Sequence, residues 1–300
     1  MPKYITLIFS NTQNFNSNIF KPGELEIKGH GGLCHNVNGY LVPLINKAKK
    51  LNLMAVLPPP WISLSKNHND QKQLSKDLYW DEYFDLTKIT NLAQKNTFQY
   101  DNNGNIITDL SISYYDSKIN LNNIKTDADI IALVNYDNPK IKNRYIHTML
   151  GSSKSIALNI SNKYKKHVDK IISELNISEF ATIHIRRGDM LYYKKDLYTK
   201  ITTSEFVANA IKKININIPI FILTNEKDVS YKETLVELLT DYKLIFETDL
   251  YKFLSDDIID NNYSMYIIIC EIANRAKINV GTEGYVRLGK KYDFRLADFK

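Results

Sequence analysis

The sequence predicts an α/β fold built from parallel sheets. Apolar runs of strand length alternate with amphipathic segments of helix length through much of the 300-residue chain. Because parallel strands need a long crossover connection, usually a helix, this alternation favours parallel over antiparallel pairing. The length suffices for two domains, and the two halves of the chain meet near residues 150–160. We therefore expect two Rossmann-like domains, residues 1–155 and 156–300.

The first half opens with a predicted strand at 5–9. It continues with a strand at 24–28, a glycine-rich turn at 29–32, a helix at 37–51 and a strand at 53–57. The helix has apolar residues at helical spacing, and a run of three prolines ends the last strand. The aromatic cluster at 79–85 is expected to pack in a core or domain interface, with sugar stacking by Trp61, Tyr79 or Trp80 as the alternative. A strand is predicted at 130–134, and the rest of 62–150 as loops and short helices.

The second half shows a regular alternation of helices and strands. Helices are predicted at 161–175, 204–214, 229–239 and 263–276, and strands at 181–185, 218–224, 244–246 and 278–281. A turn is expected at 282–285. This order is typical of a Rossmann-like layer.

Composition excludes several classes of protein. The hydrophobic and charged fractions, 44% and 24%, are ordinary for a globular chain. The net charge of +6 suits an anionic ligand, but the lysines are scattered among Asp and Asn, so no nucleic-acid partner is expected. No apolar run is long enough for a membrane span and no signal peptide is seen, which predicts a cytoplasmic protein. Two cysteines cannot form a disulfide framework.

The most informative segment is residues 181–189, with the sequence ATIHIRRGD. It is predicted to be a buried strand whose Thr182, His184 and Arg186 side chains lean to one face. Ligands of open α/β sheets bind at the carboxyl ends of the strands, and guanidinium groups match phosphate oxygens in pairs. The segment therefore indicates an anion site, most simply for a diphosphate. The alternative is an arginine pair bonded to nearby acids.

Residues 184–189, HIRRGD, resemble the HxRRxD motif of the α1,2-, α1,6- and protein O-fucosyltransferases. Residues 31–36 and 51–59 are similar to the opening pattern of the same family, a GGL-x-NQ stretch, a helix and LNRTLVLPP. Residues 77–85 resemble its acidic-aromatic segment, and 279–284 its C-terminal strand and small-residue loop. Roughly 90–160 are unmatched.

This resemblance implies a GT-B-like fold, in which two Rossmann-like domains face each other across a cleft. The C-terminal domain would bind GDP-fucose and the N-terminal domain would shape the acceptor side. The implied reaction is inverting transfer of fucose to a hydroxyl of a glycan or protein, with neither cofactor nor metal. The close acid pairs at 127–129 and 255–257 are the metal-ligand candidates, but with two arginines present no metal is expected.

The resemblance also implies roles for individual residues near the donor. Arg186 would stabilise the leaving diphosphate, with Arg187 either seconding it or holding the loop. His184 would lie near guanine or ribose, unless it is a core histidine. Thr282 and Glu283 occupy the loop that contacts the diphosphate in the family, although Glu283 is expected to face away or to bind guanine or ribose. Asp260 is the candidate for guanine recognition, with a helix cap as the alternative.

The glycine-rich turn supplies the remaining candidates, Gly31, Gly32 and Asn36. His35 and Asn36 stand where the family has Asn-Gln, a departure that affects donor and acceptor details and that would fit altered activity. Candidates for the general base are His30, His35 and Asp189. Two other functions stay open, an enzyme of this fold that uses another nucleotide sugar and a nucleotide-sugar-binding protein without turnover.

Overall fold

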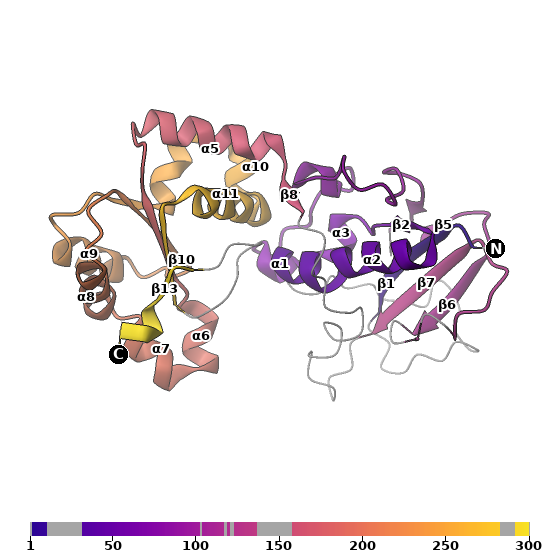
Figure 1. Ribbon diagram of the computed structural model, residues 1–300, viewed down its shortest axis with the longest axis horizontal. Coiled ribbons are helices and arrows are strands. Elements are labelled where there is room, and N and C mark those ends of the chain that lie inside the picture. Colours follow the sequence, from indigo (N-terminus) through magenta and orange to yellow (C-terminus); the bar gives the residue numbers. More distant parts are fainter. Residues whose placement is uncertain are drawn as a thin grey trace. The chain divides into compact units, whose positions relative to one another are not determined.

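The computed structural model describes residues 2–10, 32–102, 104–116, 119–120, 123–136, 158–282 and 292–299. The chain divides into two compact units, Met1–Ser161 and Asn162–Lys300. Each unit contains a parallel sheet with helices packed on it (Figure 1). The predicted α/β class with parallel sheets is therefore confirmed.

The first unit is built on a four-stranded sheet with the order β2-β1-β7-β6, in which every pairing is parallel. The strands are β1 Tyr4–Ser10, β2 Met54–Val56, β6 Ile112–Asp116 and β7 Ile130–Tyr136. Strand β6 was not predicted, whereas the other three lie where the sequence placed strands. The predicted strand at 24–28 and the turn residues 29–31 lie outside the described residues.

One helical stretch, Leu33–Leu51, crosses the first unit. It consists of α1 Leu33–Asn36, the π-helical turn η1 Val37–Leu41 and α2 Val42–Leu51, and so begins four residues before the predicted start. The π-helical turn ends two residues before Pro43, which lacks the N–H that a regular helix needs and whose ring collides with the preceding turn. Asn52 ends the helix in the left-handed conformation, with φ of 55°.

Short elements complete the first unit. They are α3 Pro60–Ser63, the 3₁₀ turns η2 Lys66–His68 and η3 Trp80–Glu82, and two antiparallel pairs, β3 Phe84–Asp85 with β8 Asn159–Ile160 and β4 Gln99–Tyr100 with β5 Ile106–Ile107. Trp80 is fully buried and its indole donates to Pro58 O at 2.6 Å. The expected packing role of the aromatic cluster is confirmed for Trp80, and stacking of Trp80 on a sugar is wrong, because no face of its ring reaches solvent.

The second unit contains a five-stranded parallel sheet with the order β11-β10-β9-β12-β13. Its strands are β9 Ala181–Ile185, β10 Ile220–Thr224, β11 Leu244–Phe246, β12 Ile278–Gly281 and β13 Phe294–Arg295. Its helices are α5 Asn162–Glu174, α6 Gly188–Tyr193, α7 Lys195–Ile201, α8 Ser204–Ile214, α9 Val229–Leu238, α10 Asp256–Ile259 and α11 Asn262–Arg275, with 3₁₀ turns η5 Glu247–Phe253 and η6 Leu296–Phe299. The arginine-bearing strand is thus the central strand.

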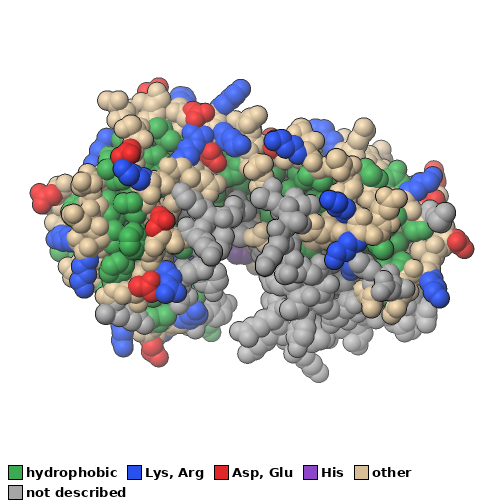
Figure 2. All heavy atoms as spheres, viewed as in Figure 1, with side chains coloured by type: hydrophobic (Ala, Val, Ile, Leu, Met, Phe, Trp, Pro, Cys, Tyr) green, Lys and Arg blue, Asp and Glu red, His purple; other side chains and the backbone are tan. Residues whose placement is uncertain are grey.

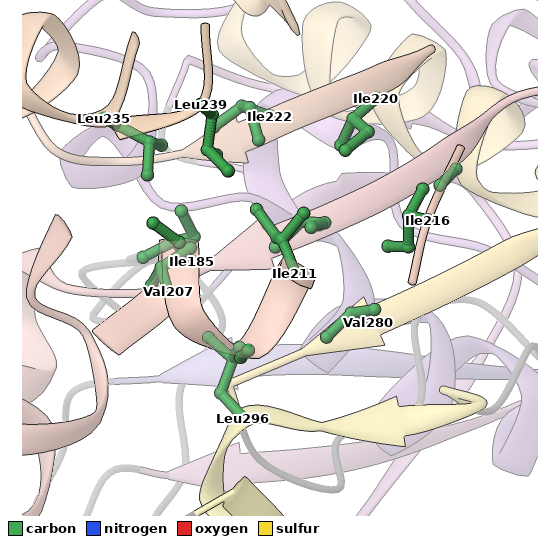
Figure 3. Close-up of a cluster of buried hydrophobic side chains, with 14 of the residues drawn as sticks. Ile185, Val207, Ile211, Ile216, Ile220, Ile222, Leu235, Leu239, Val280 and Leu296 are labelled. Atoms are coloured by element: carbon green, nitrogen blue, oxygen red, sulfur yellow. The ribbon is translucent and has the colours of Figure 1, made fainter. Parts of the chain in front are cut away.

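The two faces of this sheet differ in character. Ile183 and Ile185 of β9 lie in a buried apolar cluster with residues of the neighbouring strands and of α8 and α9; among those drawn in Figure 3 are Val207, Ile211, Ile222, Leu235, Leu239 and Val280. By strand alternation Thr182 and His184 point to the opposite face, on the side of α11, which contacts β9 and packs against α5. The predicted apolar face of Ile183 and Ile185 is therefore confirmed, and the direction of the Arg186 side chain stays a prediction.

The surface carries mixed charges. On the face drawn in Figure 2, Lys and Arg side chains are spread over both units and interspersed with Asp and Glu. Within the described ranges, no helix combines the length and the apolar character that crossing a bilayer would require.

Candidate functional site

The candidate site lies at the carboxyl edge of the second sheet. Strand β9 has β10 and β12 as its parallel neighbours, so all three strands end at this edge. His184, Arg186 and Arg187 come from the end of β9, and Thr282 follows β12 directly. The structure therefore brings together four of the residues singled out from the sequence, at the edge where ligands of open parallel sheets bind.

Thr282 holds the end of β9 in place. Its hydroxyl accepts a hydrogen bond from the Arg186 N–H at 2.8 Å and donates one to His184 O, also at 2.8 Å. A side-chain hydroxyl thus continues the β9–β12 ladder one step beyond the last backbone pair, Gly281 with His184. Since the single hydroxyl hydrogen is used on His184 O, this geometry favours a positioning role for Thr282 over donation to a phosphate.

His184 is half-buried and has an aromatic partner. Its Nδ1 lies 2.8 Å from the hydroxyl of Tyr292, and the two rings are stacked, with centroids 6.2 Å apart and an angle of 28° between planes. Tyr292 also covers Gly281, where a Cβ atom would come within 2.3 Å of the phenol ring. A glycine at this position of β12 is therefore what lets the ring approach the strand.

Both arginines are held at the end of β9. Arg186 is half-buried at the sheet edge, and its backbone is fixed by Thr282. Arg187 turns into the second unit, where its Nε donates to Glu226 at 2.7 Å and its Nη1 to Thr202 O at 2.6 Å. Its guanidinium carbon also lies 4.6 Å from the ring centroid of Tyr231. This geometry favours the loop-holding alternative for Arg187.

Glu226 is the ion-pair partner of Arg187. Partial burial alone would raise the pKa of the Glu226 carboxyl, but hydrogen bonds from the Asp228 N–H and the Arg187 guanidinium outweigh it, so the pKa lies below its ordinary value. Both side chains are less than one-fifth exposed. The Glu226 carboxyl is therefore ionised at neutral pH, and its bond to Arg187 joins the turn after β9 to the turn after β10.

The turn after β9 is also held through its backbone. The Arg187 N–H donates to Asn225 Oδ1 at 2.8 Å. The Asn225 side chain passes so close to Gly188 that a Cβ atom there would lie 2.3 Å from Nδ2. The glycine of the RRGD sequence thus makes room for this contact.

The other predicted residues are placed as follows. Asp260 is exposed in the turn between α10 and α11, at the same edge of the sheet by topology, and Asn261 rather than Asp260 caps α11. In the first unit, Asn36 is buried and its side-chain amide donates to Gly32 O at 3.2 Å. The backbones of His35 and Asp189 belong to α1 and α6, but their side chains lie outside the described part, as do residues 30, 31 and 283 altogether.

Sequence reasoning missed Tyr292, Glu226, Asn225 and Thr202. The run of polar residues 224–226 that ends β10 was a usable signal, because it lies at the carboxyl end of a strand next to β9. Tyr292 gave no such signal, since it is 108 residues from His184 and adjoins no apolar run of its own.

Comparisons with known proteins give structural likeness alone. No family model and no curated protein matches the chain. Among solved structures, the chain is similar to POFUT1 in complex with GDP-fucose, at 11% identity and a TM-score of 0.48, over 93% of this chain and 90% of that one. It is also similar to the fucosyltransferase NodZ from Bradyrhizobium, at 8% identity and a TM-score of 0.49, over 93% and 88%. A third similar structure is NodZ alpha-1,6-fucosyltransferase co-crystallized with GDP, at 8% identity and a TM-score of 0.48, over 96% of this chain and 91% of that one. Each of these three TM-scores is below 0.5, so the likeness carries no argument about function.

Proposed function

We propose that this protein is a glycosyltransferase that transfers fucose from GDP-fucose to a hydroxyl of a glycan or protein. The observation that carries the proposal is the position of the HIRRGD segment. It ends the central strand of a parallel sheet, with Arg186 at the carboxyl edge and Arg187 bonded to Glu226 behind it. The resemblance of this segment to the HxRRxD motif selects the GDP-sugar among anionic ligands.

The proposed reaction inverts the configuration at C1 of fucose. The bond between fucose C1 and the β-phosphate oxygen breaks, and its electron pair goes to that oxygen. The acceptor hydroxyl forms the new bond to C1 from the opposite side, and its proton goes to a general base. His30, His35 and Asp189 stay the candidates for this base.

Arg186 has the central electrostatic role in this proposal. Negative charge grows on the leaving GDP as the bond breaks, and a fixed donor aimed at developing charge is a strong catalytic device. The Arg186 backbone is anchored by Thr282, so the guanidinium extends from a rigid strand end. A guanidinium keeps its charge at any working pH, which supports a reaction that needs no metal.

The donor can be tested without knowing the acceptor. Thermal unfolding of the full chain in the presence of GDP, UDP or ADP measures base preference, because a ligand that binds the folded state raises Tm. We expect GDP to raise Tm most. A larger effect of UDP or ADP would contradict the assignment of GDP.

The sugar and the turnover are tested by GDP release from GDP-fucose and GDP-mannose. Faster release from GDP-fucose supports the proposal, whereas preference for GDP-mannose supports an enzyme that uses another sugar. GDP binding without release, with glycan and protein acceptors supplied, supports a nucleotide-sugar-binding protein. A cytoplasmic location is part of the proposal and is tested by fractionation of cells that produce the chain.

A further inference from the structure

We propose that Tyr292 is a positioning residue that fixes the orientation and the tautomer of His184, so that His184 presents an Nε2–H donor to the bound nucleotide. This inference rests on the proposed function for the identity of the ligand. The role of Tyr292 in the ligand-free protein can be tested independently.

The hydrogen bond between Tyr292 and His184 carries the first step. The phenol oxygen lies 2.8 Å from Nδ1, one of the two ring nitrogens of His184. A neutral imidazole has one N–H donor and one acceptor nitrogen, and the partner of one nitrogen decides which carries the proton. A phenol O–H is a good donor and a phenol oxygen a weak acceptor, so Tyr292 donates to Nδ1 and the imidazole proton lies on Nε2.

The position of Tyr292 is fixed by the sheet. The N–H of Asp293, the next residue, donates to Asn279 O at 2.8 Å, and the Asp293 carboxylate accepts from the Asn279 N–H at 2.7 Å. These bonds attach the chain to β12 directly beside Tyr292. Strand β13 then continues the parallel pairing, with Phe294 opposite Val280. The phenol is therefore delivered by a backbone that is bonded to the sheet.

The packing of the ring supports the same role. Gly281 is the partner of His184 in the β9–β12 register, and the Tyr292 ring fills the space that a side chain at 281 would need. The ring is stacked on His184 as well as bonded to it. The imidazole is thus restrained both by contact with a ring and by a hydrogen bond.

The chemical consequence is a second donor at the strand end. The His184 carbonyl and the Arg186 N–H share the Thr282 hydroxyl, so His184 and Arg186 are held in one rigid segment. An Nε2–H on His184 adds a neutral donor to the cationic guanidinium of Arg186. A nucleoside diphosphate, which is rich in acceptor oxygens, is the class of ligand that such a pair of donors would recognise.

The tautomer is measured by long-range ¹H–¹⁵N correlation spectra of the histidine rings in the full chain, at a pH of about 8, where imidazole is neutral. The chain has six histidines, and His184→Gln assigns the signals of this ring. We expect His184 in the unaltered protein to carry its proton on Nε2 alone. In Tyr292→Phe, which keeps the ring, we expect a mixture of tautomers. A proton on Nδ1 in the unaltered protein, or an unchanged tautomer in Tyr292→Phe, would overturn the inference.

A second variant disturbs the contact between Tyr292 and His184 without changing either residue. Gly281→Ala keeps the phenol but forces it away from His184. We expect the same mixture of tautomers as in Tyr292→Phe, provided that thermal unfolding shows a cooperative transition. An Nε2-only spectrum in a folded Gly281→Ala would count against the role of this contact.

GDP titration links the inference to the proposed function. Tyr292→Phe should weaken GDP binding about fivefold, the effect expected for loss of one hydrogen bond. Tyr251→Phe, a matched change at an exposed tyrosine in η5, should leave the affinity unchanged. Equal affinity of the unaltered protein and Tyr292→Phe would refute the link to the ligand. Failure of the unaltered protein to bind GDP would instead refute the proposed function, with the tautomer result standing on its own.

Discussion

The side chain of Arg187 is held by several partners within the second unit. Arg187 donates to a carboxylate, to a backbone carbonyl and, at 3.2 Å, to the Thr202 hydroxyl, and it stacks on Tyr231. These partners lie on the turn after β10, at the end of α7 and in α9, so one side chain joins three elements. The result is a fixed turn from which Arg186 extends.

Replacing Arg187 should therefore cost stability. Arg187→Lys keeps the charge, but an ammonium on a flexible stem cannot bond Glu226 and Thr202 in the same planar geometry. We expect the free energy of unfolding to fall by about 2 kcal/mol, measured by urea denaturation. Arg295→Lys, at an exposed pair with Asp298, should change it by less than about 0.5 kcal/mol. Equal effects of the two variants would contradict this role of Arg187.

The Arg187–Glu226 pair also predicts a dependence on pH. Folding lowers the pKa of Glu226 from 4.5, so the carboxylate stabilises the fold fully above that value and loses its contribution as the pH falls through the lower, folded-state pKa. The difference in unfolding free energy between the unaltered protein and Glu226→Gln should be constant from about pH 6 to 8 and should shrink below about pH 4.5. A difference that grows in acid would show that Glu226 is not held as a carboxylate.

Thr282 offers a test of the bridge between β9 and β12. Thr282→Val keeps the shape but leaves the Arg186 N–H and His184 O without their shared partner. We expect a loss of about 1–3 kcal/mol in the free energy of unfolding, because the buried Thr282 hydroxyl is replaced by a methyl group that can bond to neither. Thr282→Ser keeps the hydroxyl and should cost less. If Thr282→Val and Thr282→Ser lower the free energy of unfolding equally, the Thr282 hydroxyl does not hold the strand end.

At the scale of elements, helix α8 has local signals at both ends. The Thr203 hydroxyl accepts from the Phe206 N–H, and Asn215 ends the helix in the left-handed conformation, with φ of 58°. Caps and apolar spacing agree here, which is why the predicted range, 204–214, is the observed one. Helices α6 and α7 were missed because residues 188–201 are rich in Lys, Asp and Tyr and show little apolar spacing.

The contact between α8 and the sheet predicts a large effect of one core substitution. Ile211 is fully buried among strands and helices of the second unit (Figure 3). Ile211→Ala should lower the free energy of unfolding by about 2–5 kcal/mol through lost burial and the cavity left behind. Val236→Ala in α9, at a side chain that is 46% exposed, should change it by less than about 1 kcal/mol. Chemical denaturation of both variants checks the difference, and a loss below about 1 kcal/mol for Ile211→Ala would contradict this packing.

At the scale of the whole molecule, the sequence allowed the fold class and the strand that precedes the two arginines to be predicted, but neither the strand order nor most of the site's contacts. Apolar runs at 181–185, 220–224 and 278–281 are local signals, so the strands could be found. The contacts that define the site join residues far apart, such as Arg187 and Glu226, 39 residues along the chain. Such contacts follow from sheet order, which no local pattern encodes. The predicted cleft between two domains stays a prediction.

The central claim is that Arg186, at the carboxyl edge of the second sheet, stabilises the GDP that leaves the sugar. Turnover of GDP-fucose by Arg186→Lys tests it most directly, measured as the rate of GDP release and compared with the unaltered protein and Arg295→Lys. Because lysine keeps the charge but loses the planar pair of donors, we expect the rate to fall about 10²-fold or more in Arg186→Lys. Arg295→Lys should keep the rate of the unaltered protein. A near-normal rate in Arg186→Lys, with the unaltered protein active, would contradict the claim.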